Sequence, residues 1–260
     1  MSATPSPRVH RRVAQVMGMP ISLALRGRHA ADAWGATAWE EALAILAEVD
    51  RVFSTYRPDS YISRLGRGEI RIDDCPPEVA EVLRLGELAR VQSDGAFNVW
   101  RAAPDGKEML DPSGVVKGWA VERAARVFHS LPGTDHCLSA GGDMACRVAT
   151  PGAPAWRIGI EDPRTPNRIL AVVPVRNGAV ATSGLNHRGA HIRDARTGEV
   201  PSGVASVSVV GDSLTWADID ATAAFAHGRN ALRWLSTRPA RQGVVVWDDG
   251  TAETYRTAAA

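Results

Sequence analysis

Short apolar runs of the kind that form β-strands follow one another through the second half of the chain, and this succession most restricts the possible folds. The runs occupy residues 156–160, 169–175, 179–182 and 204–210. Segments with helical spacing of apolar residues lie on both sides of them, at residues 31–52, 118–131, 216–228 and 230–236. A parallel sheet would require strands and helices to alternate regularly. The mixed order therefore predicts an α+β fold.

Glycine and proline positions indicate the remaining elements. Residues 13–25 predict one strand with an irregularity near Gly18. Pro76 and Pro77 stand where prolines often open a helix, and this helix is expected to run to Gln92. The other expectations are an irregular segment at 95–112, an apolar run at 137–148 interrupted by Gly141 and Gly142, and closing strands at 243–247 and 254–255.

Composition excludes some classes of partner. The chain has 260 residues and a net charge of +1, so no strong field attracts nucleic acid or an anionic membrane. No stretch approaches the roughly 20 apolar residues of a membrane helix, and no signal segment is present at the N-terminus. We expect a cytoplasmic protein with residues 1–12 disordered and a single domain over 13–260.

The three cysteines, Cys75, Cys137 and Cys146, lack metal-binding spacing and are expected to be reduced thiols.

Asp218 and Thr222 form the first candidate site. They are four residues apart at the start of a helical pattern, so their side chains share one helix face. A carboxylate and a hydroxyl suit a hard cation such as Mg²⁺, which prefers oxygen ligands. Alternatively, the acid interacts with the helix dipole and the threonine is an ordinary helical residue. The pair alone does not decide between the two.

Residues 111–118 form a second candidate, because glycine, serine and lysine precede a helical segment there. Backbone N–H groups at a helix start, with the mobile cation of Lys117, can hold phosphate oxygens. The spacing is not that of a Walker A loop, and a helix-entry loop with a solvated lysine explains it equally. Gly141 and Gly142, followed by Asp143, allow the backbone to approach a ligand closely, or they form a β-bulge.

Two further segments carry polar or aromatic side chains. His187 and His191 lie in a turn-rich stretch after Thr182-Ser183-Gly184, and a histidine there can act as a general base or remain exposed without a role. Tyr56 can stack on a flat ring. The same segment can instead be a helix-capping turn at Asp59 or Ser60.

The order of these motifs resembles that of the ApbE-type flavin transferases, the FAD:protein FMN transferases, over about residues 13–228. The resemblance is carried by Met17-Gly18, residues 54–63, Gly95-Ala96-Phe97-Asn98, Asp111 with Lys117-Gly118, Gly141-Gly142-Asp143, residues 156–163, Thr182-Ser183-Gly184, His191-Ile192 with Thr197-Gly198, and Asp218 with Thr222.

The resemblance implies mixed or antiparallel sheets with packed helices, and two intertwined subdomains that enclose FAD. It implies an enzyme that moves the FMN part of FAD to a Ser or Thr hydroxyl of an acceptor protein and releases AMP. Mg²⁺ would be bound by Asp218, Thr222 and the carbonyl of Gly114, with Asp218 and His191 as catalytic residues. The implied flavin contacts are Met17, Tyr56, Ala96, Phe97, Asn98, Asp111, Lys117 and Ile192.

The sequence departs from the family pattern in places. The stretch between Phe97 and Asp111 is short, Asn98 stands where the family usually has Asp, and Ala195 replaces a common proline. Two other functions therefore stay open, a Mg²⁺-dependent FAD pyrophosphatase that yields FMN and AMP, and a non-catalytic FAD-binding protein.

Overall fold

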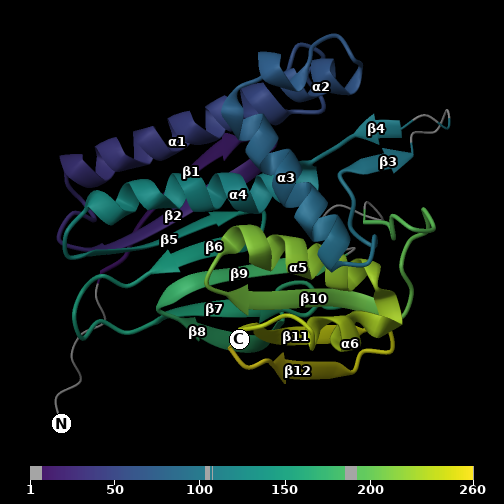
Figure 1. Ribbon diagram of the computed structural model, residues 1–260. Helices are drawn as coiled ribbons and strands as arrows, with labels where there is room; N and C mark the ends of the chain where they lie inside the picture. The colour runs from purple at the N-terminus through teal and green to yellow at the C-terminus, as the bar shows by residue number, and fades with distance from the viewer. Residues whose placement is uncertain (1–7, 103–105, 107, 185–191, 260) are drawn as a thin grey trace.

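The computed structural model describes residues 8–102, 106, 108–184 and 192–259, and Figure 1 shows their arrangement. Within these residues, eight strands form one antiparallel sheet in the order β1-β2-β5-β6-β9-β10-β11-β12. The strands are β1 (His10–Val16), β2 (Met19–Gly27), β5 (Thr134–Ala140), β6 (Asp143–Arg147), β9 (Asn177–Gly184), β10 (Val204–Gly211), β11 (Gln242–Trp247) and β12 (Ala252–Arg256). Their order in space is their order along the chain.

Two hairpins stand apart from this sheet. The first pairs β3 (Trp100–Ala102) with β4 (Glu108–Leu110), so the expectation of irregular structure over 95–112 is wrong there. The strands are too short to show a period in the sequence. The second pairs β7 (Trp156–Glu161) with β8 (Ile169–Val175), close to the runs that the sequence predicts.

Two-residue turns replace the irregularities expected near the glycines. The predicted strand over 13–25 is a hairpin, because Met17 and Gly18 both have positive φ, 56° and 67°, and connect β1 to β2. Gly141 and Gly142, with φ of 56° and 96°, connect β5 to β6 in the same way rather than forming a bulge. Two successive left-handed residues match the twist of antiparallel strands. Strand β1 begins at His10, inside the segment expected to be disordered.

The helices of the described residues follow the predicted periods with one addition. They are α1 (Ala33–Phe53), α2 (Tyr61–Gly66), α3 (Pro77–Gln92), α4 (Ser113–Ala125), α5 (Leu214–Ala226) and α6 (Ala231–Leu235), with 3₁₀ turns at Ile72–Asp74, Arg126–Ser130 (η2) and Gly228–Asn230. None of them is long and apolar enough to cross a bilayer. Helix α2 is too short for the spacing of its apolar residues to predict it. The alternative of a helix-capping turn at Asp59 or Ser60 is present, because the Ser60 side chain accepts a hydrogen bond from the Ser63 N–H at 3.1 Å.

Helix α4 begins five residues before the segment predicted from residue 118. Gly114 and Lys117 therefore lie within its first two turns and not in an entry loop. The glycines at 114 and 118 hide the helical period at this end, because they contribute no apolar side chain. Because Lys117 is on helix α4, its side chain has a fixed starting point relative to the neighbouring helix α5.

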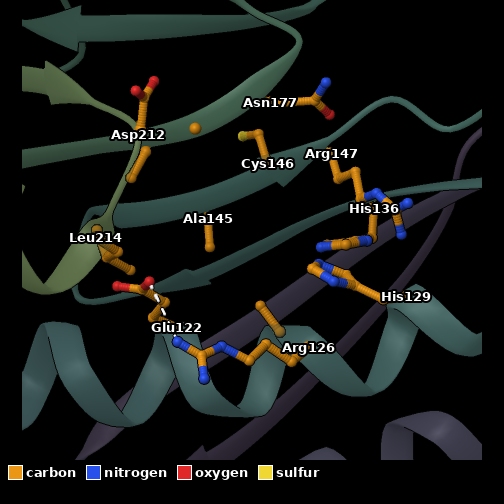
Figure 2. A pocket seen from close by; sticks show the side chains of 13 residues that line it. Glu122, Arg126, His129, His136, Ala145, Cys146, Arg147, Asn177, Asp212 and Leu214 are labelled. Atoms are coloured by element: carbon orange, nitrogen blue, oxygen red, sulfur yellow. Dashed lines mark ion pairs between the residues drawn. The ribbon is translucent and has the colours of Figure 1, made fainter. Parts of the chain in front are cut away.

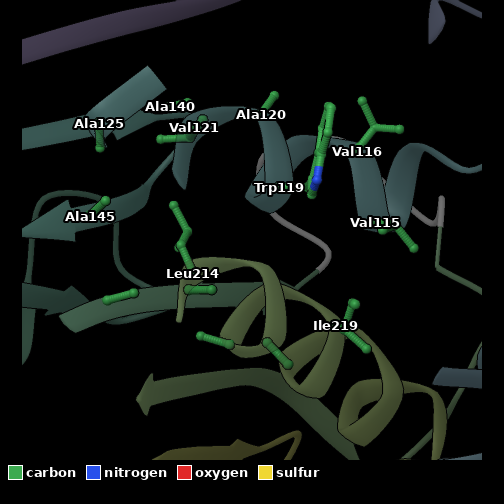
Figure 3. Close-up of a cluster of buried hydrophobic side chains, with 14 of the residues drawn as sticks. Val115, Val116, Trp119, Ala120, Val121, Ala125, Ala140, Ala145, Leu214 and Ile219 are labelled. Atoms are coloured by element: carbon green, nitrogen blue, oxygen red, sulfur yellow. The ribbon is translucent and has the colours of Figure 1, made fainter. Parts of the chain in front are cut away.

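The sheet has two buried faces. Leu138 and Ala145 pack into the main core with the helices, whereas their neighbours Cys137 and Cys146 pack against the β7–β8 hairpin. This alternation is the period of two of a β-strand. On the helical side, α4 packs on both α1 and α5 (Figure 1), and Figure 3 shows the apolar side chains that join α4 to α5. The contact between α4 and α5 positions the polar residues described next.

Candidate functional site

Gly118 permits a close contact between α4 and α5. A Cβ at this position would lie 2.8 Å from the Cβ of Asp218 and 2.8 Å from the carbonyl oxygen of Leu214. Without it, the Gly118 N–H donates to Oδ2 of Asp218 at 2.9 Å. The absence of a side chain on one helix thus places a carboxylate of the other helix against its backbone.

The Lys117 ammonium lies between two buried carboxylates. Its Nζ is 2.5 Å from Oδ2 of Asp143 and 3.2 Å from Oδ1 of Asp218. Asp143 is fully buried and Asp218 is 2% exposed, whereas the Lys117 side chain is 20% exposed. The N–H of Thr182 also donates to Oδ1 of Asp143 at 3.0 Å. The sequence suggested a mobile cation here, but Lys117 is held on a helix by two ion pairs.

The charge of this cluster is not balanced. Two carboxylates and one ammonium leave one negative charge when all three are ionised. Burial raises the pKa of the Asp218 carboxyl, the Lys117 ammonium opposes this rise, and the Asp143 carboxylate adds to it. Burial alone would lower the pKa of Lys117, but Asp218 and Asp143 together raise it above its ordinary value. An additional cation would stabilise the ionised form of Asp218.

Thr222 follows Asp218 by one turn of α5. Its Oγ1 lies 3.1 Å from Oγ of Ser183, a residue of β9. The predicted shared face of Asp218 and Thr222 is therefore present, and it is directed toward α4 and β9. Among the described residues, no three His, Cys, Asp or Glu side chains converge as metal ligands. A cation here would need mixed donors, which are carboxylate, hydroxyl and carbonyl oxygens.

Gly114 and Phe97 are adjacent. A Cβ on Gly114 would lie 2.9 Å from Cε2 of Phe97, so the glycine accommodates the aromatic ring. Ala96 and Phe97 are both buried, and the Ala96 carbonyl accepts the Ala195 N–H at 3.1 Å. This bond ties residues 96–97 to the segment that begins with Ile192, which is also buried.

The other predicted flavin contacts have different surroundings, and Met17 packs against the core cluster that includes Phe97 and Ile192. Tyr56 is 96% exposed, and Met17 lies in the β1–β2 turn. Asn98 accepts the Trp100 N–H at 3.0 Å, and Asp111 pairs with Arg101 at 2.8 Å while accepting the Ser113 N–H at 3.2 Å. His187 and the predicted base His191 lie outside the described residues.

The sequence drew attention to the segments of Asp143 and Ser183 without giving either residue a role. The signal was the Gly-Gly-Asp and Thr-Ser-Gly order. Neither segment indicates which distant residues it meets, because the partners Lys117 and Thr222 belong to other elements.

Residues 17–103 and 100–246 match the family model described as the ApbE family. The chain belongs to the ApbE family. It is 30% identical over 267 residues to an FAD:protein FMN transferase of Vibrio cholerae, covering 80% of this chain and 79% of that protein. A protein of the same name from Haemophilus influenzae is 24% identical over 251 residues, covering 74% of this chain and 72% of the other.

A solved ApbE protein of Thermotoga maritima has the same fold. Its structure aligns with a TM-score of 0.81 at 19% identity, covering 96% of this chain and 97% of the other. The predicted α+β class, with antiparallel sheet and packed helices, is therefore confirmed. The arrangement of two subdomains around FAD stays a prediction.

Proposed function

We propose that this protein transfers the FMN moiety of FAD to a Ser or Thr hydroxyl of an acceptor protein and releases AMP, in a reaction that requires Mg²⁺. The observation that carries the proposal is the buried, net-negative cluster of Asp143, Lys117 and Asp218, with the Thr222 hydroxyl one turn away. Membership in the ApbE family and the names of the two relatives support flavin transfer as its use.

The chemistry of the donors fits a magnesium ion. Asp218 supplies a carboxylate whose two oxygens keep lone pairs after bonding to Lys117 and Gly118, because an ionised carboxylate has about four acceptor sites. Thr222 supplies a hydroxyl on the same helix face. A regular helix pairs the Gly118 N–H with the Gly114 carbonyl. Here that N–H donates to Asp218, and the family resemblance proposes the Gly114 carbonyl, in the first turn of α4, as the third ligand.

The reaction replaces the phosphoanhydride bond of FAD with a phosphoester bond to the acceptor. The acceptor hydroxyl oxygen forms a bond to the phosphorus on the FMN side of the pyrophosphate. The bond from that phosphorus to the bridging oxygen breaks, and AMP departs with the oxygen. The hydroxyl proton passes to a base, for which the family resemblance proposes His191. Bound Mg²⁺ would neutralise charge on the pyrophosphate oxygens.

The protein's own residues contribute position and charge. Lys117 holds Asp143 and Asp218 in place and offsets part of their charge, so Asp218 can remain ionised while buried. Phe97 supplies apolar surface beside Gly114, and we assign it, with the buried Ala96 and Ile192, to the flavin side of the substrate. The proposed flavin contacts Met17, Tyr56, Asn98 and Asp111 complete the set.

One incubation tests the proposed activity. The protein, FAD and Mg²⁺ are combined with candidate acceptors encoded by neighbouring genes, and acceptor peptides are analysed by mass spectrometry. A Ser or Thr peptide heavier by one FMN, with AMP released in equal amount, is the expected result. Free FMN and AMP without a modified peptide would indicate a pyrophosphatase, and unchanged FAD would indicate a non-catalytic FAD-binding protein.

The cytoplasmic location of the protein stays a prediction.

A further inference from the structure

A cavity of about 300 Å³ lies on the helix-covered face of the sheet, beyond the C-terminal half of α4. Figure 2 shows its lining. His136 of β5, Arg147 of β6 and Asn177 of β9 line it from the sheet, and His129 of η2 lines it from the helical layer. Its volume is at the lower end of the range for small-molecule pockets.

This cavity is separate from the Lys117 cluster. Asp143 and Arg147 are both on β6 and differ by four positions, so they point to the same face of the sheet. At the rise of a strand, their Cα atoms are roughly 13 Å apart. Asp143 faces Lys117 at one end of α4, and Arg147 lines the cavity at the other end.

One end of the cavity holds the Arg147 guanidinium beside two histidines, His129 and His136. The ring centroids of His129 and His136 are 5.4 Å apart, and Figure 2 shows Arg147 beside them. Within the described residues, the Arg147 guanidinium has no hydrogen-bond or ion-pair partner. His136 is 1% exposed, and its Nδ1 has no partner among these residues. A buried polar atom without a partner usually marks a missing hydrogen-bonding group.

The acidic groups of the lining do not neutralise this end. Oε2 of Glu122 accepts hydrogen bonds from Ser213 Oγ, Thr215 Oγ1 and the Thr215 N–H at 2.7–2.8 Å. Oε1 of Glu122 lies 3.6 Å from Arg126, the ion pair drawn in Figure 2. Asp212 lies across the cavity from the histidines in the same view.

We propose that this cavity binds a small molecule with an oxyanion, a phosphate or carboxylate group, held between Arg147, His129 and the Nδ1 of His136. An oxyanion gives the guanidinium a charge-assisted partner and gives His136 a hydrogen-bond partner. Burial, His129 and Arg147 lower the pKa of His136 to about 3, so it is a neutral hydrogen-bonding group near pH 7. The site is additional to the flavin and metal centre and does not depend on it.

Inorganic phosphate is the first probe, titrated into the full-length protein at constant ionic strength. Imidazole ¹H–¹⁵N NMR follows the seven histidines of the chain, assigned by single substitutions. We expect saturable shifts of the His129 and His136 signals. Arg147→Gln should weaken binding about 10-fold or more, as expected for loss of a charged hydrogen bond, and His129→Gln should weaken it less. Arg84→Gln, an exposed arginine of α3, is the matched control and should leave binding unchanged.

A series of small carboxylates of equal charge then separates the two sources of oxyanion. The probe that saturates the His129 and His136 signals at the lower concentration, phosphate or a carboxylate, identifies the class of ligand. The proposal is overturned if no probe shifts His129 and His136 saturably, or if Arg147→Gln binds as well as Arg84→Gln. A saturable shift confined to His191, the histidine proposed for the flavin centre, would also overturn it, because it would assign the anion to that centre.

Discussion

At the scale of single residues, the unusual feature is an ammonium shared by two buried carboxylates. Burial of one charge is unfavourable unless a partner compensates it, and a cluster of three is stable only as a unit. Lys117, Asp143 and Asp218 come from α4, β6 and α5, so the cluster also joins three elements. The family resemblance predicts Lys117 as a flavin contact and Asp218 as a metal ligand. It did not predict that they pair, because the spacing along a chain carries no information on contacts between distant elements.

Asp218→Ala is expected to remove Mg²⁺-dependent flavin transfer while FAD binding survives at least in part. The variant loses the proposed ligand but keeps the apolar surface near Phe97. FAD fluorescence measures binding, and the rate of acceptor modification at limiting Mg²⁺ measures transfer. Asp73→Ala, at an exposed aspartate, should behave as wild type. Full transferase activity of Asp218→Ala would remove the metal assignment.

Lys117→Gln is expected to lower the free energy of unfolding by about 3–5 kcal/mol, because two buried carboxylates lose their shared counter-charge. Urea denaturation measures the loss. Combining it with Asp143→Asn should recover part of the stability, since one of the two uncompensated charges is then removed. Equal destabilisation in the single and double variants would show that the ion pairs are not coupled.

His191→Ala is expected to slow transfer by about 10²-fold or more, as for removal of a general base. Binding of FAD should change little, so the effect should appear in the maximal rate. A rate equal to that of the wild type would leave His191 with a structural role only.

At the scale of elements, long periodic segments were predicted well and short ones were not. Helices α1 and α3 begin and end within about two residues of the sequence expectation. Helix α2, the β3–β4 hairpin and the start of α4 were missed, because each shows too few apolar positions to reveal a period. Residues 13–25 form a hairpin and not one strand because the backbone turns at Met17, which has positive φ. Methionine rarely adopts this conformation, so the sequence does not predict the turn.

Gly118→Ala tests the close contact of α4 with α5. Alanine favours a helix by up to about 1 kcal/mol over glycine. Its Cβ would nevertheless overlap the backbone oxygen of Leu214 and the Asp218 side chain, and separating the helices should cost about 1–3 kcal/mol. We expect lower stability in urea and a higher Mg²⁺ requirement for transfer. A variant more stable than wild type would show that the helices can separate freely.

At the scale of the molecule, stability is expected to decline in mild acid. Burial, with His129 and Arg147 nearby, lowers the pKa of His136 to about 3 in the folded protein, from about 6.5 in the unfolded chain. The unfolded state therefore binds the extra proton, and the free energy of unfolding falls as the pH drops below about 6.5, by up to about 1.4 kcal/mol per pH unit, until about pH 3. Chemical denaturation across this range measures the slope.

His136→Gln is the matched variant for that slope, because it removes the titrating ring and keeps a polar side chain. The decline between pH 6.5 and 4 should become shallower than in wild type. Burial lowers the pKa of His129 and His227 as well, so a smaller slope of the same sign should remain. Parallel curves for the two proteins would remove His136 as the cause.

The strand order of the large sheet is also the order in which a ribosome releases the strands. Each newly made strand can join the edge left by the one before it, and β1 and β12 remain at the outer margins. Folding from the N-terminus during synthesis then needs no rearrangement of strands already paired. Asp218 and Thr222 emerge only after β10. A nascent chain therefore assembles most of its sheet before the proposed metal centre exists, and unfinished chains lack the groups needed for chemistry.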